Sequence, residues 1–313
     1  MRSDSSRYHL SNHRPSEADL AVLAEIRRQT APFKGGLSAP LGRPAYDEMM
    51  EACPPASDVS CQQGQVAGFP AVWCRVSDAP KDVAILYLHG GGYAVGSAWG
   101  YRNFVGQFAA RTGLDALIVD YPLAPEHPFP AALECAKAVY RALAAGGYAR
   151  IVIMGDSAGG GLTLSLLAAV AADRGAFGAE PVCAVAMSPW TDLTLAGASH
   201  RERAAEEFYL DHASVEKFAS DYAVTHPRTD PAVSPLFGSL KGLPRIQIHV
   251  GTAEILLSDS EAYADKAQAA GTDVDLHVWE AMPHVFPHSF AALEGAEQAM
   301  AMMTGFIRDN VEG

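Results

Sequence analysis

The stretch that decides the fold is Ile151-Val152-Ile153-Met154-Gly155-Asp156-Ser157-Ala158-Gly159-Gly160-Gly161. Its first four residues are apolar and mostly β-branched, which predicts a short buried strand. Residues 162–172 are apolar on nearly every side and predict a helix buried in a large core. Between them lies the pattern G-x-S-x-G, so a sharp turn must join the strand to the helix. We therefore expect Ser157 to adopt a strained backbone conformation, with its hydroxyl exposed at the end of the strand.

This turn has the features of a nucleophile site. Side chains at Gly155 and Gly159 would collide with a neighbouring strand or helix, so glycine is needed at both positions. The amide groups at the start of the helix lie beside the Ser157 hydroxyl and can hold negative charge. The pattern alone also fits a glycine-rich loop with an ordinary serine. Its place between a strand and a helix favours a nucleophilic Ser157.

Length and composition limit the classes of protein that this chain can be. With 313 residues, of which 49% are hydrophobic, it can form one large domain or two small ones. It has no apolar run long enough to span a membrane, and Met1–Ser16 lacks the apolar segment of a signal peptide. The net charge of −13 disfavours nucleic acid and membrane surfaces as partners.

The cysteine pattern indicates a reduced compartment. The five cysteines are Cys53, Cys61, Cys74, Cys135 and Cys183, and none forms a C-x-x-C pair. The last three lie in apolar segments, where we expect small buried hydrophobic side chains. A cytoplasmic location fits this odd number of scattered cysteines. No metal-ligand spacing such as H-E-x-x-H occurs, so we predict no metal site.

From Gly64 onward the chain alternates between strand patterns and helix patterns. Expected strands are 65–69, 71–76, 83–88, 116–120, 151–154, 182–187, 245–250 and 274–279. Expected helices are 104–112, 131–145, 162–172, 258–270 and 290–311. This alternation predicts an α/β fold with a mostly parallel central sheet and helices on both faces.

Two segments fall outside the alternation. The N-terminal section predicts helices at 17–30 and near 46–52, and about fifty residues with a helix at 211–223 separate two core strands. An insertion of that length usually covers a site. We predict that residues 1–55 and 196–225 form one helical cap over the strand ends where Ser157 emerges. Residues 56–195 and 226–313 then form the catalytic domain.

A nucleophilic serine needs a base, and the base needs an acid that orients it. With a nucleophile on a strand-to-helix turn, the partners follow in the order serine, acid, histidine. Glu254 is the first carboxylate after the strand 245–250, and Asp259 is its rival. The run Ser258-Asp259-Ser260-Glu261 has the form of a capping box, which gives Asp259 a structural role at a helix start. The sequence therefore favours Glu254.

The base is expected in the loop after the strand 274–279. His284 lies there, His288 is four residues further on, and His277 falls within the strand. His284 is the favoured base, and His277 is expected to be a packed or surface residue.

The run His89-Gly90-Gly91-Gly92 follows another expected strand and fits an oxyanion-hole loop. Without side chains, its backbone can approach a substrate closely, so that its amides and that of Ala158 point at the developing oxyanion. A simple glycine turn is the alternative, which the G-x-S-x-G pattern downstream disfavours. We expect His89 to hold the loop in place.

The chain resembles the hormone-sensitive-lipase-like family of bacterial carboxylesterases, which have the α/β-hydrolase fold. The motifs that carry the resemblance are 89–92, 120–130 (Asp-Tyr-Pro-Leu-Ala-Pro-Glu-His-Pro-Phe-Pro), 155–159 and 188–192 (Ser-Pro-Trp-Thr-Asp). The resemblance implies Ser157 as nucleophile, His284 as base, and oxyanion donors at Gly91, Gly92 and Ala158. It also implies a cap of N-terminal helices plus the insertion after 192. Glu254 stands where many members have aspartate.

We therefore expect a carboxylesterase that hydrolyses short-to-medium acyl esters through an acyl-enzyme, without a cofactor. A lactone hydrolase or a metabolite deacetylase would use the same triad. A ligand-binding receptor on the same fold is disfavoured because His284 is present. The expected partner is a small-molecule ester, and the chain is expected to be a monomer or a homodimer. The expected substrate-binding residues are Phe33, Tyr93, Trp99, Phe208, Tyr209, Leu210 and Phe286.

Overall fold

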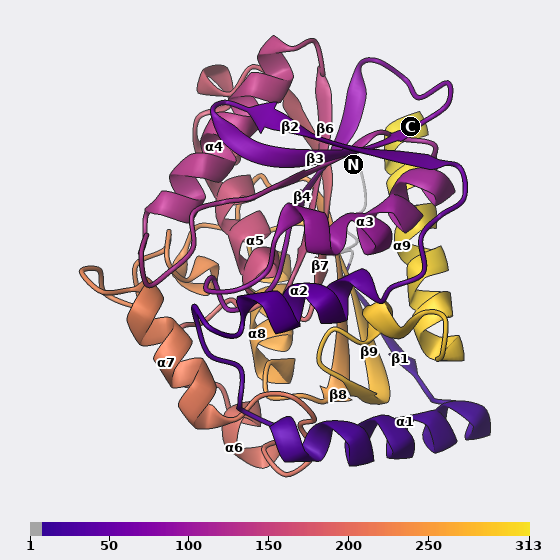
Figure 1. Cartoon of the computed structure of the whole chain (residues 1–313). Helices are drawn as coiled ribbons and strands as arrows, with labels where there is room; N and C mark the ends of the chain where they lie inside the picture. The colour runs from indigo at the N-terminus through magenta and orange to yellow at the C-terminus, as the bar shows by residue number, and fades with distance from the viewer. Residues whose placement is uncertain (1–7) are drawn as a thin grey trace, which may run out of the picture.

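The computed structural model describes residues 8–313, and a nine-stranded sheet runs through its centre (Figure 1). The strand order is β1-β9-β8-β7-β6-β4-β5-β3-β2. The strands are β1 (Tyr8–His13), β2 (Val59–Val66), β3 (Phe69–Val76), β4 (Val83–Leu88), β5 (Ala116–Val119), β6 (Arg150–Asp156), β7 (Glu180–Met187), β8 (Arg245–Ala253) and β9 (Val274–Pro283). All neighbours from β1 to β5 pair in parallel, and β3 and β2 continue the sheet antiparallel. This topology confirms the predicted mostly parallel sheet.

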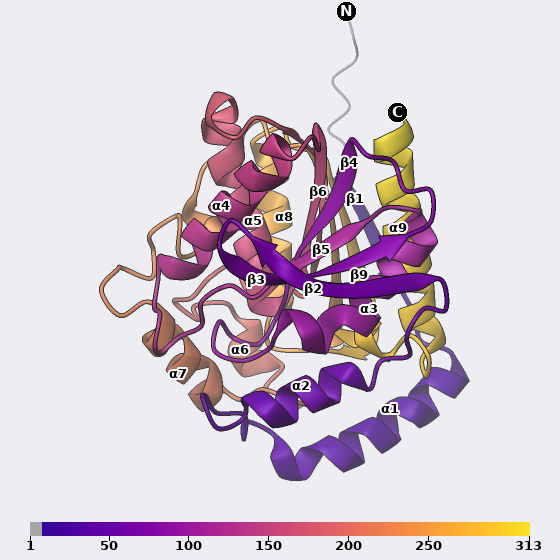
Figure 2. The ribbon, with the colours of Figure 1, turned by 45° about the horizontal axis from the view of Figure 1, so that its top comes forward.

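Helices cover both faces of the sheet (Figure 2). The helices are α1 (Glu17–Thr30), α2 (Arg43–Glu51), α3 (Ala98–Thr112), α4 (Ala131–Ala145), α5 (Ser157–Ala172), α6 (Ser199–Glu202), α7 (His212–Tyr222), α8 (Leu257–Ala269) and α9 (Glu294–Glu312). One hydrophobic core contains residues of α4, α5 and α8, and a second contains residues of α3 and α9. Every residue of β4 and β5 is buried between these layers. Burial on both faces explains why these strands are continuously apolar.

Four further helices, α1, α2, α6 and α7, gather at one end of the molecule (Figures 1 and 2). They come from the N-terminal section and from the segment between β7 and β8. Lys34 Nζ donates to the carbonyl oxygens of Ala204 at 2.7 Å and Glu207 at 2.8 Å, and the Gly35 amide donates to the Tyr209 carbonyl at 2.8 Å. Segments far apart in sequence therefore lie side by side. Their role as one cap domain stays a prediction.

The strand β1 was not predicted. Its sequence, Tyr-His-Leu-Ser-Asn-His, is polar because β1 is an edge strand, paired only with β9. His13 contributes to its attachment, since its ring stacks on Trp279 at 3.9 Å and its Nε2 lies 3.1 Å from His277 Nδ1. The prediction that Met1–Ser16 carries no signal peptide falls partly on residues 1–7, which lie outside the described residues. Among the helices of residues 8–313, none is long and apolar enough to cross a membrane.

Candidate active site

The turn around Ser157 joins β6 directly to α5. Ser157 has a φ of +53°, in the left-handed region that costs energy for any residue with a side chain. A Cβ atom on Gly155 would lie 2.4 Å from the Leu88 carbonyl oxygen, and one on Gly159 only 2.1 Å from the same atom. Both positions therefore require glycine, as the sequence predicted. The strained turn places the Ser157 hydroxyl at the carboxyl end of the strand.

Three polar side chains form a chain of contacts that begins at this hydroxyl. His284 Nε2 lies 2.9 Å from Ser157 Oγ, and His284 Nδ1 lies 2.8 Å from Glu254 Oε2. Glu254 is fully buried and His284 nearly so. With a proton on Nδ1 that is donated to Glu254, Nε2 is free to accept the hydroxyl proton of Ser157. The arrangement is that of a nucleophile, a base and an orienting acid.

A further serine holds Glu254 and the histidine loop together. The other carboxylate oxygen of Glu254 accepts hydrogen bonds from Ser188 Oγ and from the Gly251 amide, each at 2.7 Å. Ser188 Oγ in turn accepts from the amide of Val285 at 3.0 Å. One hydroxyl thus links the carboxylate to the backbone beside His284. This role was not predicted, because Ser188 was notable only as the first residue of a motif.

The electrostatic surroundings favour a protonated His284. Burial alone opposes charge on its ring, but the charge of Glu254 and its hydrogen bond outweigh burial, so the pKa of His284 is raised. The surroundings therefore favour the positively charged form of the His284 ring. Burial, with the charge of His284 added, lowers the pKa of His288 to about 3. His288 Nε2 lies 3.8 Å from Asp156 Oδ2. Geometry therefore favours His284 over His288 as the base.

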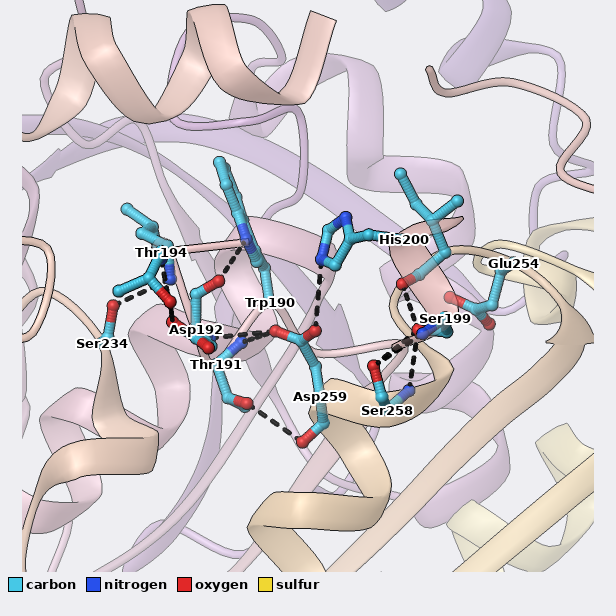
Figure 3. A network of polar contacts seen from close by, with 12 residues as sticks. Trp190, Thr191, Asp192, Thr194, Ser199, His200, Ser234, Glu254, Ser258 and Asp259 are labelled. Carbon is cyan, nitrogen blue, oxygen red and sulfur yellow. Dashed lines mark hydrogen bonds and ion pairs between the residues drawn. The ribbon is translucent and has the colours of Figure 1, made fainter. Parts of the chain in front are cut away.

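Asp259 makes a different set of contacts (Figure 3). Its Oδ1 accepts from the amides of Thr191 at 3.0 Å and Asp192 at 2.9 Å, while its Oδ2 lies 3.5 Å from His200 Nε2. The carboxylate therefore organises the loop after β7. The predicted capping box is wrong, because α8 begins at Leu257 without a side-chain cap. The contacts of Asp259 depend on residues far away in sequence, which no local pattern reveals.

These elements can be compared with known proteins. A family model described as the alpha/beta hydrolase fold matches residues 85–288. An acetyl-hydrolase of Streptomyces hygroscopicus is 39% identical, over 85% of this chain and 88% of its own. An esterase of Acinetobacter venetianus is 33% identical, over 84% of this chain and 87% of its own. The crystal structure of an esterase from the bacterial hormone-sensitive lipase family matches with a TM-score of 0.85 and 36% identity, over 95% of this chain and 99% of that one.

The chain belongs to the hormone-sensitive lipase family and has the α/β-hydrolase fold.

In this α/β hydrolase, the residue before Ser157 anchors the glycine loop. Asp156 Oδ1 accepts from the Gly90 amide at 3.0 Å and from the Tyr87 hydroxyl at 2.7 Å, and Oδ2 accepts from the Tyr101 hydroxyl at 3.0 Å. Burial raises the pKa of Asp156 to about 6, although these hydrogen bonds oppose the shift. The Tyr101 hydroxyl also lies 2.8 Å from that of Tyr46 in α2. The N-terminal section is therefore connected to the loop through buried polar groups.

The glycine loop itself needs its glycines. Gly91 and Gly92 have φ angles of +110° and +61°. A Cβ atom on Gly92 would lie 2.7 Å from the ring of Phe218 in α7, so the insertion packs directly on the loop. His89 Nδ1 lies 2.8 Å from the Gly90 carbonyl oxygen, and its ring stacks on Tyr121 at 4.3 Å, which fits a structural role. Oxyanion binding by Gly91, Gly92 and Ala158 stays a prediction.

The large apolar residues predicted to bind substrate differ in their surroundings. Tyr93, Phe208 and Phe286 are buried, and Tyr209 and Leu210 are partly buried. Phe33 and Trp99 are exposed, with 76% and 37% of their surface accessible. Tyr93 stacks on Tyr222 of α7 at 3.8 Å. The exposure of Phe33 makes it the weakest candidate for a pocket wall. Within residues 8–313, no group of three His, Cys, Asp or Glu side chains could hold a metal ion.

A second buried carboxylate touches the turn that carries Glu254. Glu207 lies in the segment between β7 and β8, where its Oε1 accepts from the Tyr209 amide at 2.9 Å and its Oε2 from the Ile255 amide at 3.0 Å. The Ser199 hydroxyl donates to the Ile255 carbonyl oxygen at 2.5 Å. The insertion thus binds both backbone polar groups of the residue that follows Glu254. Glu207 was not predicted from the sequence, because it belongs to no motif.

Proposed function

We propose that this protein is a serine carboxylesterase that hydrolyses short-to-medium acyl esters through an acyl-enzyme. The observation that carries the proposal is the chain of contacts from Ser157 through His284 to Glu254, at 2.9 and 2.8 Å. Its relatives support the reaction class, since they are an acetyl-hydrolase and an esterase. A small acyl group agrees with the name of the first of these relatives.

The mechanism follows from the positions of the three side chains. His284 accepts the proton of Ser157 through Nε2 while Ser157 attacks the ester carbonyl. Glu254 orients the imidazole through Nδ1 and stabilises its positive charge. The amides of Gly91, Gly92 and Ala158 bind the oxyanion. His284 then protonates the leaving alcohol and afterwards activates the water that hydrolyses the acyl-enzyme.

The proposal includes a cap made of residues 1–55 and 196–225 over a catalytic domain of residues 56–195 and 226–313. Contacts between Lys34 and Glu207, and between Phe218 and the glycine loop, support a cap that is tied to the site at several points. The pocket under it takes a small ester of apolar character. We retain the cytoplasmic location that the cysteine pattern predicts, and the mechanism needs neither a cofactor nor a metal.

Two alternatives share the fold. A lactone hydrolase or a metabolite deacetylase would use the same three side chains on a different ester. A non-catalytic receptor would bind an ester or an acid without cleaving it, and the hydrogen-bonded triad disfavours this interpretation. Turnover of p-nitrophenyl acetate distinguishes them, because an esterase releases p-nitrophenol through many cycles. A p-nitrophenyl phosphonate should also modify Ser157 alone, with one equivalent per chain. Tight binding of esters without release of alcohol would indicate a receptor.

A further inference from the structure

Two cysteines face each other at the edge of the sheet, far from the proposed chemistry. Cys61 on β2 and Cys74 on β3 are directly paired in the antiparallel register, and their sulfur atoms lie 3.7 Å apart. Opposite residues in antiparallel strands have Cα atoms about 4.5–5.5 Å apart. Disulfides span Cα separations of about 4.4–6.8 Å. Side-chain rotation alone can therefore bring the two sulfurs to bonding distance.

The surroundings of the two thiols differ. Cys61 lies on the edge strand and is partly exposed, so a small solute can reach it. Cys74 is fully buried, and its Sγ lies 3.5 Å from the Arg102 carbonyl oxygen. The hydrogen bond between the thiols and the positive charge of Arg102 hold the pKa of Cys61 below its usual value, despite partial burial. Cys61 thus has the properties of an attacking thiolate, and Cys74 those of a resolving thiol.

We propose that Cys61 and Cys74 form a disulfide across the β2–β3 hairpin when the protein meets a peroxide. The Cys61 thiolate attacks one oxygen of hydrogen peroxide, which breaks the O–O bond and gives a sulfenic acid and hydroxide. The hydroxide takes a proton to become water. The Cys74 thiol then attacks the Cys61 sulfur, the S–O bond breaks, and the oxygen leaves as a second water with the thiol proton. Two thiols are oxidised and one peroxide is reduced.

The other cysteines provide internal controls. Cys53, Cys135 and Cys183 are all buried, and within residues 8–313 no second sulfur lies within hydrogen-bond distance of any of them. They should remain thiols under conditions that oxidise the partly exposed Cys61. The proposal does not depend on the esterase function.

The experiment treats the native full-length chain with a small excess of hydrogen peroxide. The chain is then denatured in an alkylating agent and analysed by intact mass and peptide mapping. We expect the mass to fall by two hydrogen atoms before alkylation, two thiols to be lost, and peptides containing Cys61 and Cys74 to be joined. A thiol reductant should restore both thiols. The Cys135→Ser variant should behave like the wild type, whereas Cys61→Ser should lose the cross-link.

Three outcomes would overturn the proposal. In the first, Cys61 is oxidised to sulfinic or sulfonic acid while Cys74 stays available for alkylation. In the second, Cys61 joins a second chain, which non-reducing electrophoresis would show as a covalent dimer. In the third, neither cysteine reacts at peroxide concentrations that oxidise free cysteine. Mapping of the wild-type chain alone distinguishes all three, so the proposal remains testable if a variant fails to fold.

Discussion

The segment that runs from the end of β8 into the first turn of α8 carries two buried carboxylates that the fold uses in different ways. Glu254 directs one oxygen at the His284 imidazole and the other at Ser188 and Gly251. Asp259, five residues later, directs one oxygen at two backbone amides of the loop after β7. Both side chains are fully desolvated. Burial therefore does not identify the acid of a triad; the direction of its oxygens does, because only Glu254 reaches the histidine loop.

The largest expected effect comes from Ser157, the proposed nucleophile, on which the assignment of Glu254 depends. Ser157→Ala should lower kcat for p-nitrophenyl acetate by about 10⁶, the loss seen when a serine nucleophile is removed from a related triad. The fold should survive, because the turn depends on Gly155 and Gly159. Ser165→Ala, in the same helix, is the matched control and should keep full activity. Activity within tenfold of the wild type in Ser157→Ala would exclude Ser157 as nucleophile.

The different roles of Glu254 and Asp259 are tested by exchanging each carboxylate for its amide. Glu254→Gln should lower kcat by about 10⁴, because an amide leaves the imidazole misoriented and its charge unpaired. Asp259→Asn should lower kcat far less and destabilise the protein by about 1–3 kcal/mol, since it weakens hydrogen bonds from two buried amides. Steady-state kinetics and thermal unfolding of both variants measure these effects. If the losses in kcat are reversed, Asp259 is the acid.

Glu207 is another buried carboxylate, which contacts the backbone beside Glu254 without a hydrogen bond to His284. Both of its oxygens accept backbone amide hydrogens. In Glu207→Gln the new NH₂ group must face one of these donors, so the turn should shift and kcat should fall by about tenfold. Its charge also raises the pKa of His284, so the pH profile should move toward lower pH. Glu206→Gln is the control, since Glu206 is partly exposed and pairs with Arg203.

A positioning role for Glu207 predicts that kcat and the pH profile change together while KM changes little. A loss of thermal stability with unchanged kcat and an unchanged pH profile would instead indicate a purely structural role. Glu206→Gln should leave all three quantities as in the wild type, because its ion pair is exposed to solvent.

The pH dependence tests whether Glu254 acts on His284 as the geometry indicates. His284 must be neutral to accept the serine proton, so activity should be lost as the pH falls through its pKa. Because the pKa is raised, the midpoint for kcat/KM should lie above the free histidine value of about 6.5. Glu254→Gln should move the remaining activity to a lower midpoint, while Asp259→Asn should not. A flat wild-type profile from pH 5 to 8 would contradict histidine as the base.

The contrast between Glu254 and Asp259 also explains which features could be predicted from the sequence. Local patterns predicted the alternating sheet and the glycines of the Ser157 turn, because periodicity and spacing within one motif carry these features. Glu254 and His284 were chosen because each follows an expected strand, and their catalytic roles stay predictions. The sequence did not reveal the contacts of Asp259, Ser188 and Glu207. Each of these side chains binds a loop that is distant in sequence and that only the folded structure brings close to it. The strand β1 was missed because an edge strand needs no continuous apolar run.

The smallest expected effect concerns the length of the acyl chain. It tests whether the insertion between β7 and β8, which contacts the Glu254 turn, also closes the pocket. Phe218 packs on Gly92, and the Lys34 ammonium joins the N-terminal section to the insertion between β7 and β8. A site closed in this way favours acyl chains of roughly two to eight carbons. Each added CH₂ should contribute about 0.8 kcal/mol until the pocket is full, so kcat/KM should rise over the first few carbons and then fall.

The measurement is kcat/KM for p-nitrophenyl esters from acetate to palmitate, at concentrations where each ester is monomeric. Ser157→Ala provides the background rate for every ester, so that spontaneous hydrolysis does not distort the profile. A maximum at twelve carbons or longer would contradict the closed pocket, and would mean that the insertion opens or that the acyl group lies in a surface groove. In that case its contacts with the Ile255 backbone would serve to hold the Glu254 turn, and closure of the site would have to be assigned to other residues.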